Sequence, residues 1–452
     1  MKKLRHIREV IKPTQILAIG FFTVILTGAL LLMLPISTNS GHLSFLDAFF
    51  TATSATCVTG LVVVDTGTYF TFFGQVIIIL LIQLGGLGFM TVATFLFIAS
   101  GKRISLKERM TMAESLGESQ LQGVLKLALN ILKVTFLVEF LGALLLAIRF
   151  IPTYGTATGI WYSVFHSISA FCNAGFDLIG RYMSFTGYVS DPLLSLTIMA
   201  LIIIGGLGFG VVMELFRKKN LRNLRVHSKI ILTMTVVLIL GGTVLFLLFE
   251  YSNPLTLGKL PFWDKVLAAS FQSVTTRTAG FNSIDQLAMH DSSKLLSVML
   301  MFIGGSPAGT AGGIKTSTIA VLFLITKALI KNRSDVEAYG KRLGNSILRK
   351  ALAIFLIGLT ALIVAVIIIS INEQNTLVGQ SGFLNQLFEA VSAIGTVGLS
   401  TGITGNASDL TLIVLCILMF MGRVGLLTIA FAFGSKSEES YLKYPEEDIL
   451  VG

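Results

Sequence analysis

Four short aromatic segments, each followed by a tight turn that ends in glycine, recur along an apolar chain. This repetition constrains the fold most, because a segment of about a dozen residues is too short to cross a bilayer. Each segment can only enter the membrane and return, and it must then be covered by protein rather than lipid. The four turns are Cys57-Val58-Thr59-Gly60, Cys172-Asn173-Ala174-Gly175, Arg277-Thr278-Ala279-Gly280 and Gly395-Thr396-Val397-Gly398.

The composition places these turns in a membrane. Hydrophobic residues make up 54% of the chain and charged residues 13%, whereas a soluble domain carries roughly 25% charged residues. Apolar stretches of membrane-spanning length recur along the whole sequence. The first, at 14–34, is too long for a signal-peptide core and has no small-residue cleavage site after it, so we expect a retained helix.

The predicted fold is an all-α membrane protein with four pseudo-repeats of helix, pore loop and helix around one pore. It would have eight transmembrane helices plus four re-entrant half-helices, with continuous second helices near 73–99, 192–216 and 411–432. The second helix of the third repeat, near 294–329, carries a break. We divide the chain into a cytoplasmic N-terminus at 1–12, repeat 1 at 13–100 with pore loop 44–61, repeat 2 at 101–216 with pore loop 160–176, repeat 3 at 217–330 with pore loop 263–281 and gate loop 304–315, repeat 4 at 331–434 with pore loop 383–399, and a cytoplasmic tail at 435–452; repeats 2 to 4 begin with basic linkers.

The repeats share a register that is counted back from the turn glycine. A phenylalanine stands ten residues before it and a serine six residues before it in three repeats, and the third repeat is displaced by one. These residues are Phe50, Phe165 and Phe388, Ser54, Ser169 and Ser392, and in the third repeat Phe271 and Ser273. The second helices also repeat a glycine cluster, as in Gly85-Gly86-Leu87-Gly88, which is typical of close helix packing.

The charge distribution orients the chain. Its net charge is +10, but most lysines and arginines lie between repeats or at the termini, on one side of the membrane. That side is cytoplasmic by the positive-inside bias, which also argues against nucleic-acid binding. On the opposite side acids outnumber bases. These acids either concentrate cations at the entrance of the pore or are ordinary solvated loop charges.

The turns suit a cation that has lost its water shell. Backbone carbonyls can replace that shell where glycine permits unusual conformations, and half-helix C-termini add partial negative charge. Potassium is the expected ion at Gly60, Gly175, Gly280 and Gly398, because a divalent ion favours carboxylates and no turn contains one.

A second irregular segment interrupts the third repeat. Its glycines and proline predict unwound backbone in the membrane, which is tolerated only in a wet cavity or under protein cover. We interpret it as a mobile gate below the filter; the alternative is a kinked helix without a gating role. The candidate gate residues are Gly304, Gly305, Ser306, Pro307, Ala308, Gly309, Thr310, Ala311, Gly312, Gly313, Lys315 and Arg423.

Two of these gate residues, Lys315 and Arg423, are basic within membrane segments, where a charge is costly and usually functional or paired. Arg423 has five donors for carbonyls that the gate leaves unpaired. Lys315 either faces the cavity as a cationic plug or extends to the cytoplasmic edge.

Other classes of protein are less well supported. A coupled secondary transporter requires an intramembrane acid, and the candidates Glu139 and Glu214 are expected away from the turns. An intramembrane enzyme requires paired catalytic groups, and His166 near Ser167 is the nearest approach, so we predict no catalytic residues. A membrane anchor for a partner would tolerate replacement of the turn glycines. The glycine clusters do not match a phosphate-binding motif, and no organic cofactor is expected.

The four turns, the interrupted third repeat and Arg423 resemble the Trk/Ktr/HKT superfamily of cation uptake proteins, and most closely its bacterial KtrB-type membrane subunit. The resemblance implies that the turn glycines form a potassium filter, that 304–313 is an intramembrane gate and that Arg423 is its partner. It also implies a homodimer in the bacterial cell membrane, on a cytosolic RCK/KTN-type ring that binds ATP/ADP or NAD, with possible sodium dependence. The 444–452 tail resembles one used in subunit contact. Cys57 and Cys172 depart from the family pattern, in which threonine or asparagine is more common.

Overall fold

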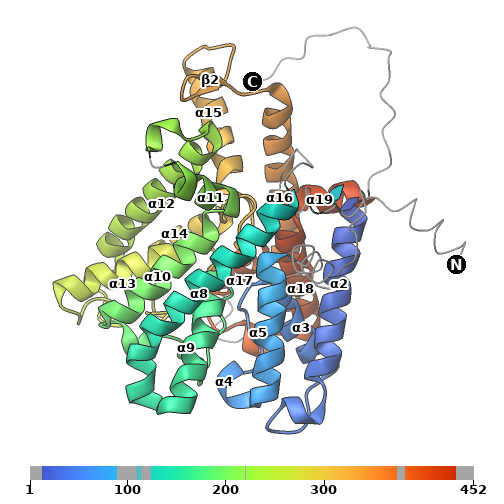
Figure 1. Ribbon diagram of the computed structural model, residues 1–452, viewed down its shortest axis with the longest axis vertical. Coiled ribbons are helices and arrows are strands. Elements are labelled where there is room, and N and C mark those ends of the chain that lie inside the picture. Colours follow the sequence, from blue (N-terminus) through green and yellow to red (C-terminus); the bar gives the residue numbers. More distant parts are fainter. Residues whose placement is uncertain are drawn as a thin grey trace, which may run out of the picture.

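The computed structural model describes residues 13–88, 109, 110, 112, 124–218, 220–373 and 382–433. The predicted N-terminus, most of the linker between the first two repeats and the predicted tail lie outside the described residues. Most of the described part is helical (Figure 1).

Among these residues, four helices are long and apolar enough to cross a membrane. They are α2 (Pro13–Leu32), α8 (Val124–Tyr154), α12 (Val226–Glu250) and α16 (Asn345–Asn372). Each begins one of the predicted repeats. One face of α8 exposes Phe136, Leu137 and Phe140, each more than half accessible, which is the surface expected of a helix that faces lipid.

A shorter helix packs against each of these long helices. The short helices are α3 (Phe45–Cys57), α9 (Thr156–Phe171), α13 (Phe262–Thr275) and α17 (Phe383–Gly395), and their contacts are with α2, α8, α12 and α16 respectively. Most residues of their C-terminal halves are buried, and so are the phenylalanines that share the repeat register. These helices are therefore enclosed by the rest of the chain, as a half-length helix in a membrane must be.

The second helices of repeats 2 and 4 are more broken than the sequence suggests, and residues 89–99 of the predicted second helix of repeat 1 lie outside the described residues. The pieces are α5 (Phe72–Leu87), α10 (Pro192–Gly206) and α11 (Phe209–Arg217), α14 (Asp291–Phe302) and α15 (Thr316–Ile330), and α18 (Asp409–Val424) and α19 (Leu426–Phe433). The predicted break of the third repeat lies between α14 and α15.

The prediction of continuous helices at 192–216 and 411–432 is wrong. Gly208 and Gly425 adopt φ angles of 88° and 100°, which a continuing helix cannot accommodate and which glycine adopts without steric cost. The axes of α10 and α11 consequently differ by 99°. The second helices of the predicted eight are therefore built from shorter helical pieces rather than from single long helices.

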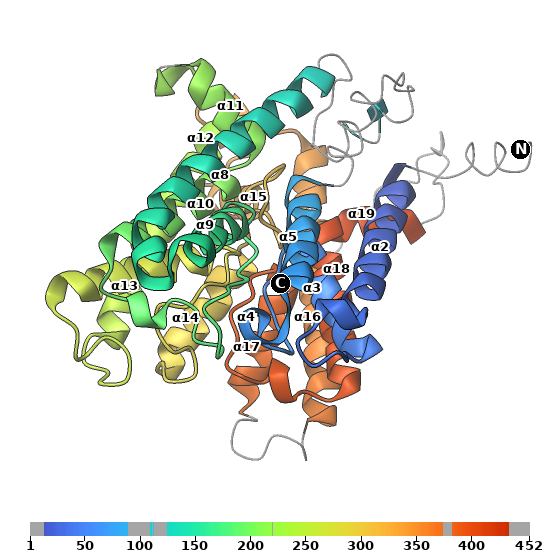
Figure 2. The same ribbon diagram turned by 60° about the horizontal axis from the view of Figure 1, so that its bottom comes forward.

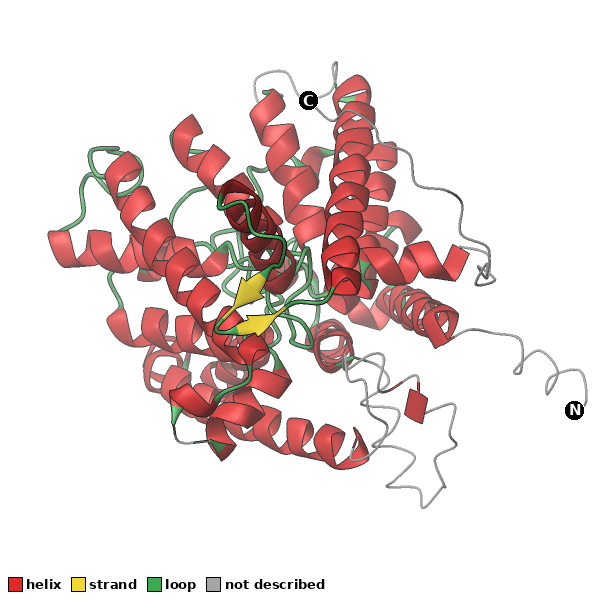
Figure 3. Cartoon of the chain, turned by 90° about the horizontal axis from the view of Figure 1, so that it is seen from above, coloured by secondary structure: helices red, strands yellow, loops and turns green. Residues whose placement is uncertain are grey.

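The helices surround a central region of loops and turns, as the view from above shows (Figure 3). Contacts of α3 with α18, and of α14 with α17, bring the first and third repeats to the fourth. The helix α4 (Thr66–Tyr69) and the adjoining loops lie at one end of the molecule (Figure 1), which the view turned by 60° brings forward (Figure 2). At the opposite end, β1 (Glu337–Ala338) pairs antiparallel with β2 (Lys341–Arg342) in a small hairpin. Single-turn helices lie at Pro35–Ser37, Thr186–Tyr188, Leu221–Asn223 and Thr404–Asn406.

Candidate functional site

The four glycine turns share one backbone conformation at the ends of their helices. The residue two positions before each glycine has a left-handed backbone, with φ of 58° at Val58, 60° at Asn173, 65° at Thr278 and 49° at Thr396. A left-handed non-glycine residue costs about 1–2 kcal/mol. All four are buried, so the surrounding packing, rather than local preference, holds this conformation.

The four glycines meet in a closed ring. A Cβ on Gly60 would lie 2.5 Å from the Ala174 carbonyl oxygen, and one on Gly175 would lie 2.8 Å from that of Ala279. Gly280 faces the Val397 carbonyl in the same way, and Gly398 faces that of Thr59. Each glycine thus lies against the carbonyl that precedes the next glycine. All four also have positive φ, so a side chain at any of them meets both strain and a collision.

The third turn is one residue shorter than the second. The Ala174 N–H donates to the carbonyl five residues earlier, at Ser169, with a length of 2.8 Å. The Ala279 N–H donates to the carbonyl only four residues earlier, at Thr275, with a length of 2.9 Å. This difference explains why Phe271 stands nine rather than ten residues before the turn glycine. It also makes Thr275, rather than Ser273, the counterpart of Ser169. Sequence reasoning missed Thr275, although a gap of one residue in the register was the signal for it.

The ends of the short helices also contact glycines of the second helices. A Cβ on Gly85, Gly205 or Gly422 would overlap the carbonyl oxygen of the short helix of its own repeat. The glycine clusters are therefore explained by close approach of backbone to backbone, in line with the packing interpretation. The three carbonyls belong to Thr56, Phe171 and Ile394.

A cavity of about 280 Å³ opens on one side of the ring. All four glycines line it, and so do the acids Asp65, Asp177 and Asp285. Burial, and to a smaller extent the neighbouring Asp65, raises the pKa of Asp177 to about 7. This side lies at the end of the molecule opposite the basic hairpin (Figure 1).

The segment between α14 and α15 lies on the other side of the ring. Thr310 joins it to the second turn, because its hydroxyl donates to Asn173 Oδ1 at 3.0 Å. A Cβ on Gly312 would collide with the Thr396 side chain of the fourth turn. The Thr310 N–H donates to the Gly205 carbonyl at 3.2 Å, and the Gly313 N–H to the Gly422 carbonyl at 3.1 Å. The segment thus contacts the second and fourth turns and the C-terminal ends of α10 and α18.

Arg423 joins this segment to the first repeat. Its guanidinium donates to the carbonyl oxygens of Thr310 and Gly85, and to that of Gly86 at 3.0 Å. It therefore binds carbonyls from two separate elements. Lys315 Nζ donates to the Ala311 carbonyl at 2.8 Å, within its own segment, and both basic residues line a cavity of about 300 Å³.

Glu139 and Glu214, the two acids considered for a coupled transporter, lie in different parts of the structure. Glu214 lies at the basic end, where it accepts from Lys218 Nζ and Ser228 Oγ. The expectation that Glu139 lies away from the turns is wrong, because its Oε1 is 4.0 Å from Cys172 Sγ of the second turn. Gln83 Nε2 donates to both its oxygens, at 3.0 and 3.2 Å. Sequence spacing alone did not reveal that α8 passes behind this turn.

The residues considered for catalysis form no catalytic pair. His166 contacts the Tyr162 carbonyl and accepts from the Leu178 N–H at 3.2 Å. The Ser167 hydroxyl donates to the Glu139 carbonyl instead. The three cysteines are buried and free. In the described part of the chain no three His, Cys, Asp or Glu side chains are grouped to hold a metal.

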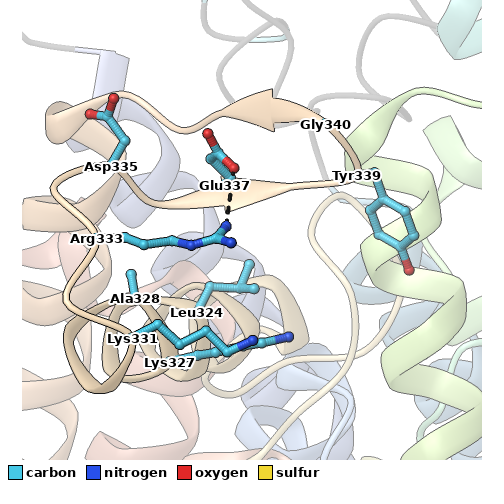
Figure 4. A pocket seen from close by; sticks show the side chains of 9 residues that line it. All are labelled: Leu324, Lys327, Ala328, Lys331, Arg333, Asp335, Glu337, Tyr339 and Gly340. Atoms are coloured by element: carbon cyan, nitrogen blue, oxygen red, sulfur yellow. Dashed lines mark hydrogen bonds and ion pairs between the residues drawn. The ribbon is translucent and has the colours of Figure 1, made fainter.

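A separate hollow of about 220 Å³ lies beneath the hairpin (Figure 4). Lys327, Lys331, Arg333 and Glu337 line it, and Arg333 and Glu337 pair at 3.4 Å. It has no turn glycine in its lining, so it is distinct from the ring and its two cavities.

Comparisons with known proteins place this geometry in context. A family described as TrkH, cation transport protein, matches residues 3–443. The chain is 41% identical to the potassium/sodium uptake protein NtpJ of Enterococcus hirae, over 100% of this chain and 99% of that protein. It is 42% identical to Ktr system potassium uptake protein B of Bacillus subtilis, over 97% of both chains. The crystal structure of the potassium transporter TrkH from Vibrio parahaemolyticus matches with a TM-score of 0.72 at 18% identity, covering 94% of this chain and 86% of that one. This last likeness supports the helical fold.

Proposed function

Because the chain belongs to the TrkH family of cation transport proteins, we propose that it takes up potassium through the ring of Gly60, Gly175, Gly280 and Gly398. The family is one of transporters, in line with the prediction that the protein is not an enzyme. Two relatives that align along nearly their whole length are named for potassium uptake, and one of them for sodium as well.

The closed ring of glycines and carbonyls is the observation that carries this proposal. A desolvated monovalent cation needs several oxygens at matched distances, and the carbonyls of Thr59, Ala174, Ala279 and Val397 lie between neighbouring glycines. These four repeats of helix, pore loop and helix would then enclose one pore. The acids of the outer cavity raise the local cation concentration, and the membrane potential drives the ion inward.

The segment at 304–315 acts as the gate in this proposal. It closes the inner side of the ring through Thr310 and Gly312, and Arg423 holds it in place. Release of this segment would let the ion pass. In the bacterial cell membrane the protein would work as a homodimer, under a cytosolic regulatory ring that binds ATP/ADP or NAD, with sodium as a possible activator.

The first experiment compares potassium and sodium flux into liposomes that contain wild type or Gly60→Ser. The serine Cβ collides with the Ala174 carbonyl, so we expect the potassium-to-sodium ratio to fall by roughly tenfold, within the usual range of overpacking costs. Gly187→Ser is the matched control, because nothing lies within 4 Å of a Cβ at that position. An unchanged ratio in Gly60→Ser would refute the filter.

Coupled transport is the second candidate, and the contact of Glu139 with Cys172 favours it. Potassium uptake would then require a proton or sodium gradient and would stop in Glu139→Gln. Uptake that follows the membrane potential alone, in wild type and in this variant, excludes it.

A further inference from the structure

Behind each of the four turns, one buried hydroxyl makes a hydrogen bond to the backbone at the turn glycine or at the residue after it. The hydroxyls belong to Ser54, Ser169, Thr275 and Ser392, which occupy equivalent positions once the shorter third turn is taken into account. All four side chains are at most 1% exposed, so water does not compete for these bonds.

The four bonds are of two kinds. Ser54 Oγ accepts from the Gly60 N–H at 3.1 Å, and Ser392 Oγ accepts from the Gly398 N–H at 3.0 Å. In the other two repeats the hydroxyl donates. Ser169 donates to the Phe176 carbonyl at 2.7 Å, and Thr275 donates to the Phe281 carbonyl at 2.8 Å.

We infer that these four hydroxyls are positioning residues that set the ion selectivity of the ring, and that they do so in two ways. This inference rests on the proposed function. In repeats 1 and 4 the hydroxyl fixes the glycine peptide itself. In repeats 2 and 3 it holds the carbonyl after the glycine on the protein side, because an oxygen that accepts from a hydroxyl behind the turn is turned away from an ion in front of it.

The glycines explain why such anchors are needed. A glycine peptide has no side chain to pack and can rotate at little steric cost, yet selectivity requires oxygens at defined positions. Buried hydroxyls with short bonds limit that rotation. Loss of one hydroxyl leaves either a buried N–H without an acceptor or a carbonyl free to turn toward the pore, and the first is costly.

The consequence is a ring that is fourfold in its glycines but divided into two unlike halves in its outer oxygens. The Phe176 and Phe281 carbonyls belong to adjacent repeats 2 and 3 and are both engaged. In the described part of the chain the equivalent carbonyls of Leu61 and Leu399 have no such bond to a serine or threonine hydroxyl. An ion at the outer end therefore meets different oxygens on its two sides.

The test measures potassium and sodium flux in liposomes for Ser169→Ala and Thr275→Val. We expect the potassium-to-sodium ratio to fall by roughly two- to tenfold in each, the range that corresponds to one hydrogen bond. Ser163→Ala is the control on the same helix as Ser169, because its buried hydroxyl donates to the Gly159 carbonyl within that helix. Ser163→Ala should keep the wild-type ratio, as should Thr275→Ser, which retains the hydroxyl.

Wild-type ratios in folded Ser169→Ala and Thr275→Val would overturn the inference. If those variants do not fold, a changed ratio in Thr275→Ser would overturn it, because only a methyl group is lost. Gly60→Ser is measured beside them. An unchanged potassium-to-sodium ratio in Gly60→Ser would refute the proposed filter. A changed ratio in Gly60→Ser with wild-type ratios in the hydroxyl variants would refute only this inference.

Discussion

At the scale of single residues, the contacts of polar groups identify what holds the ring. Glu389 of α17 shows this clearly, because it is buried and accepts from the Thr401 N–H at 2.9 Å and from the Ser400 and Thr404 hydroxyls. His166 joins α9 to the Leu178 N–H in an equivalent way. Each of these side chains connects a short helix, by hydrogen bonds, to the loop that follows the turn glycine of the same repeat. Both lie within the predicted pore loops 160–176 and 383–399, but local sequence pattern does not reveal their partners, which lie more than ten residues away.

In the proposed mechanism, we expect Asp177 to make cation uptake depend on pH. With a pKa of about 7, it is mostly ionised at pH 8 and mostly protonated at pH 6. Lowering the pH therefore removes one negative charge from the entrance, and uptake from dilute potassium should fall by about two- to fivefold, as expected for a loss of up to about 1 kcal/mol of attraction.

This dependence is measured as initial potassium uptake by liposomes at an external pH between 6 and 8. Asp177→Asn removes the titrating group and should abolish the step in this range. If Asp177→Asn keeps the same pH profile as wild type, Asp177 is not its origin.

At the scale of elements, the broken second helices are what brings the segment at 304–315 beneath the ring. Gly208 ends one helix so that α11 can turn away, and the Phe209 N–H then donates to the Ala308 carbonyl at 2.8 Å. The break in the third repeat was readable from its glycines and proline. Those at Gly208 and Gly425 were not, because glycines of the same cluster, such as Gly85 and Gly205, continue a helix.

The hydrogen bonds of Arg423 connect this segment to the first repeat. Arg423→Ala leaves the Thr310, Gly85 and Gly86 carbonyls without their donor, and we expect basal potassium flux to rise by roughly fivefold or more, in keeping with the cost of buried unsatisfied groups. Arg423→Lys should behave similarly, since an ammonium lacks the planar fork that spans two elements. The measurement is flux from liposomes without any regulatory partner.

Deletion of 305–312 is the complementary variant. It should also raise basal flux and leave the potassium-to-sodium ratio unchanged, because the ring residues remain. A basal flux equal to wild type in both Arg423→Ala and the deletion would contradict a gating role.

At the scale of the whole molecule, the charge pattern defines two ends. The hairpin lies at one end of the molecule (Figure 1), with its basic neighbours Lys327 and Lys331 beneath it (Figure 4). The acidic cavity above the ring lies at the other. The positive-inside bias assigns the hairpin to the cytoplasm.

Cysteine labelling tests this orientation. Lys341→Cys should react with a membrane-impermeant maleimide only after the cells are opened, whereas Gly187→Cys should react in intact cells. Both positions are exposed, and the native cysteines Cys57, Cys172 and Cys416 are buried, so we expect little background. The reverse pattern would invert the topology and place the acidic cavity inside.

The sequence by itself determined the features that depend on local pattern. Apolar length identified the long first helices, and the register of phenylalanine, serine and glycine located the short helices and their turns to within a few residues. The physical reason is that bilayer thickness and helix periodicity act on contiguous residues.

Only the tertiary structure decided which groups meet across repeats. The ring places Gly60 beside Ala174 and Gly398 beside Thr59, although these residues are far apart in the chain. The same is true of Glu139 behind Cys172 and of Arg423 between Thr310 and Gly85. Such contacts depend on how four helix groups pack around one axis, and the free energy of that packing is shared among residues that no local pattern connects.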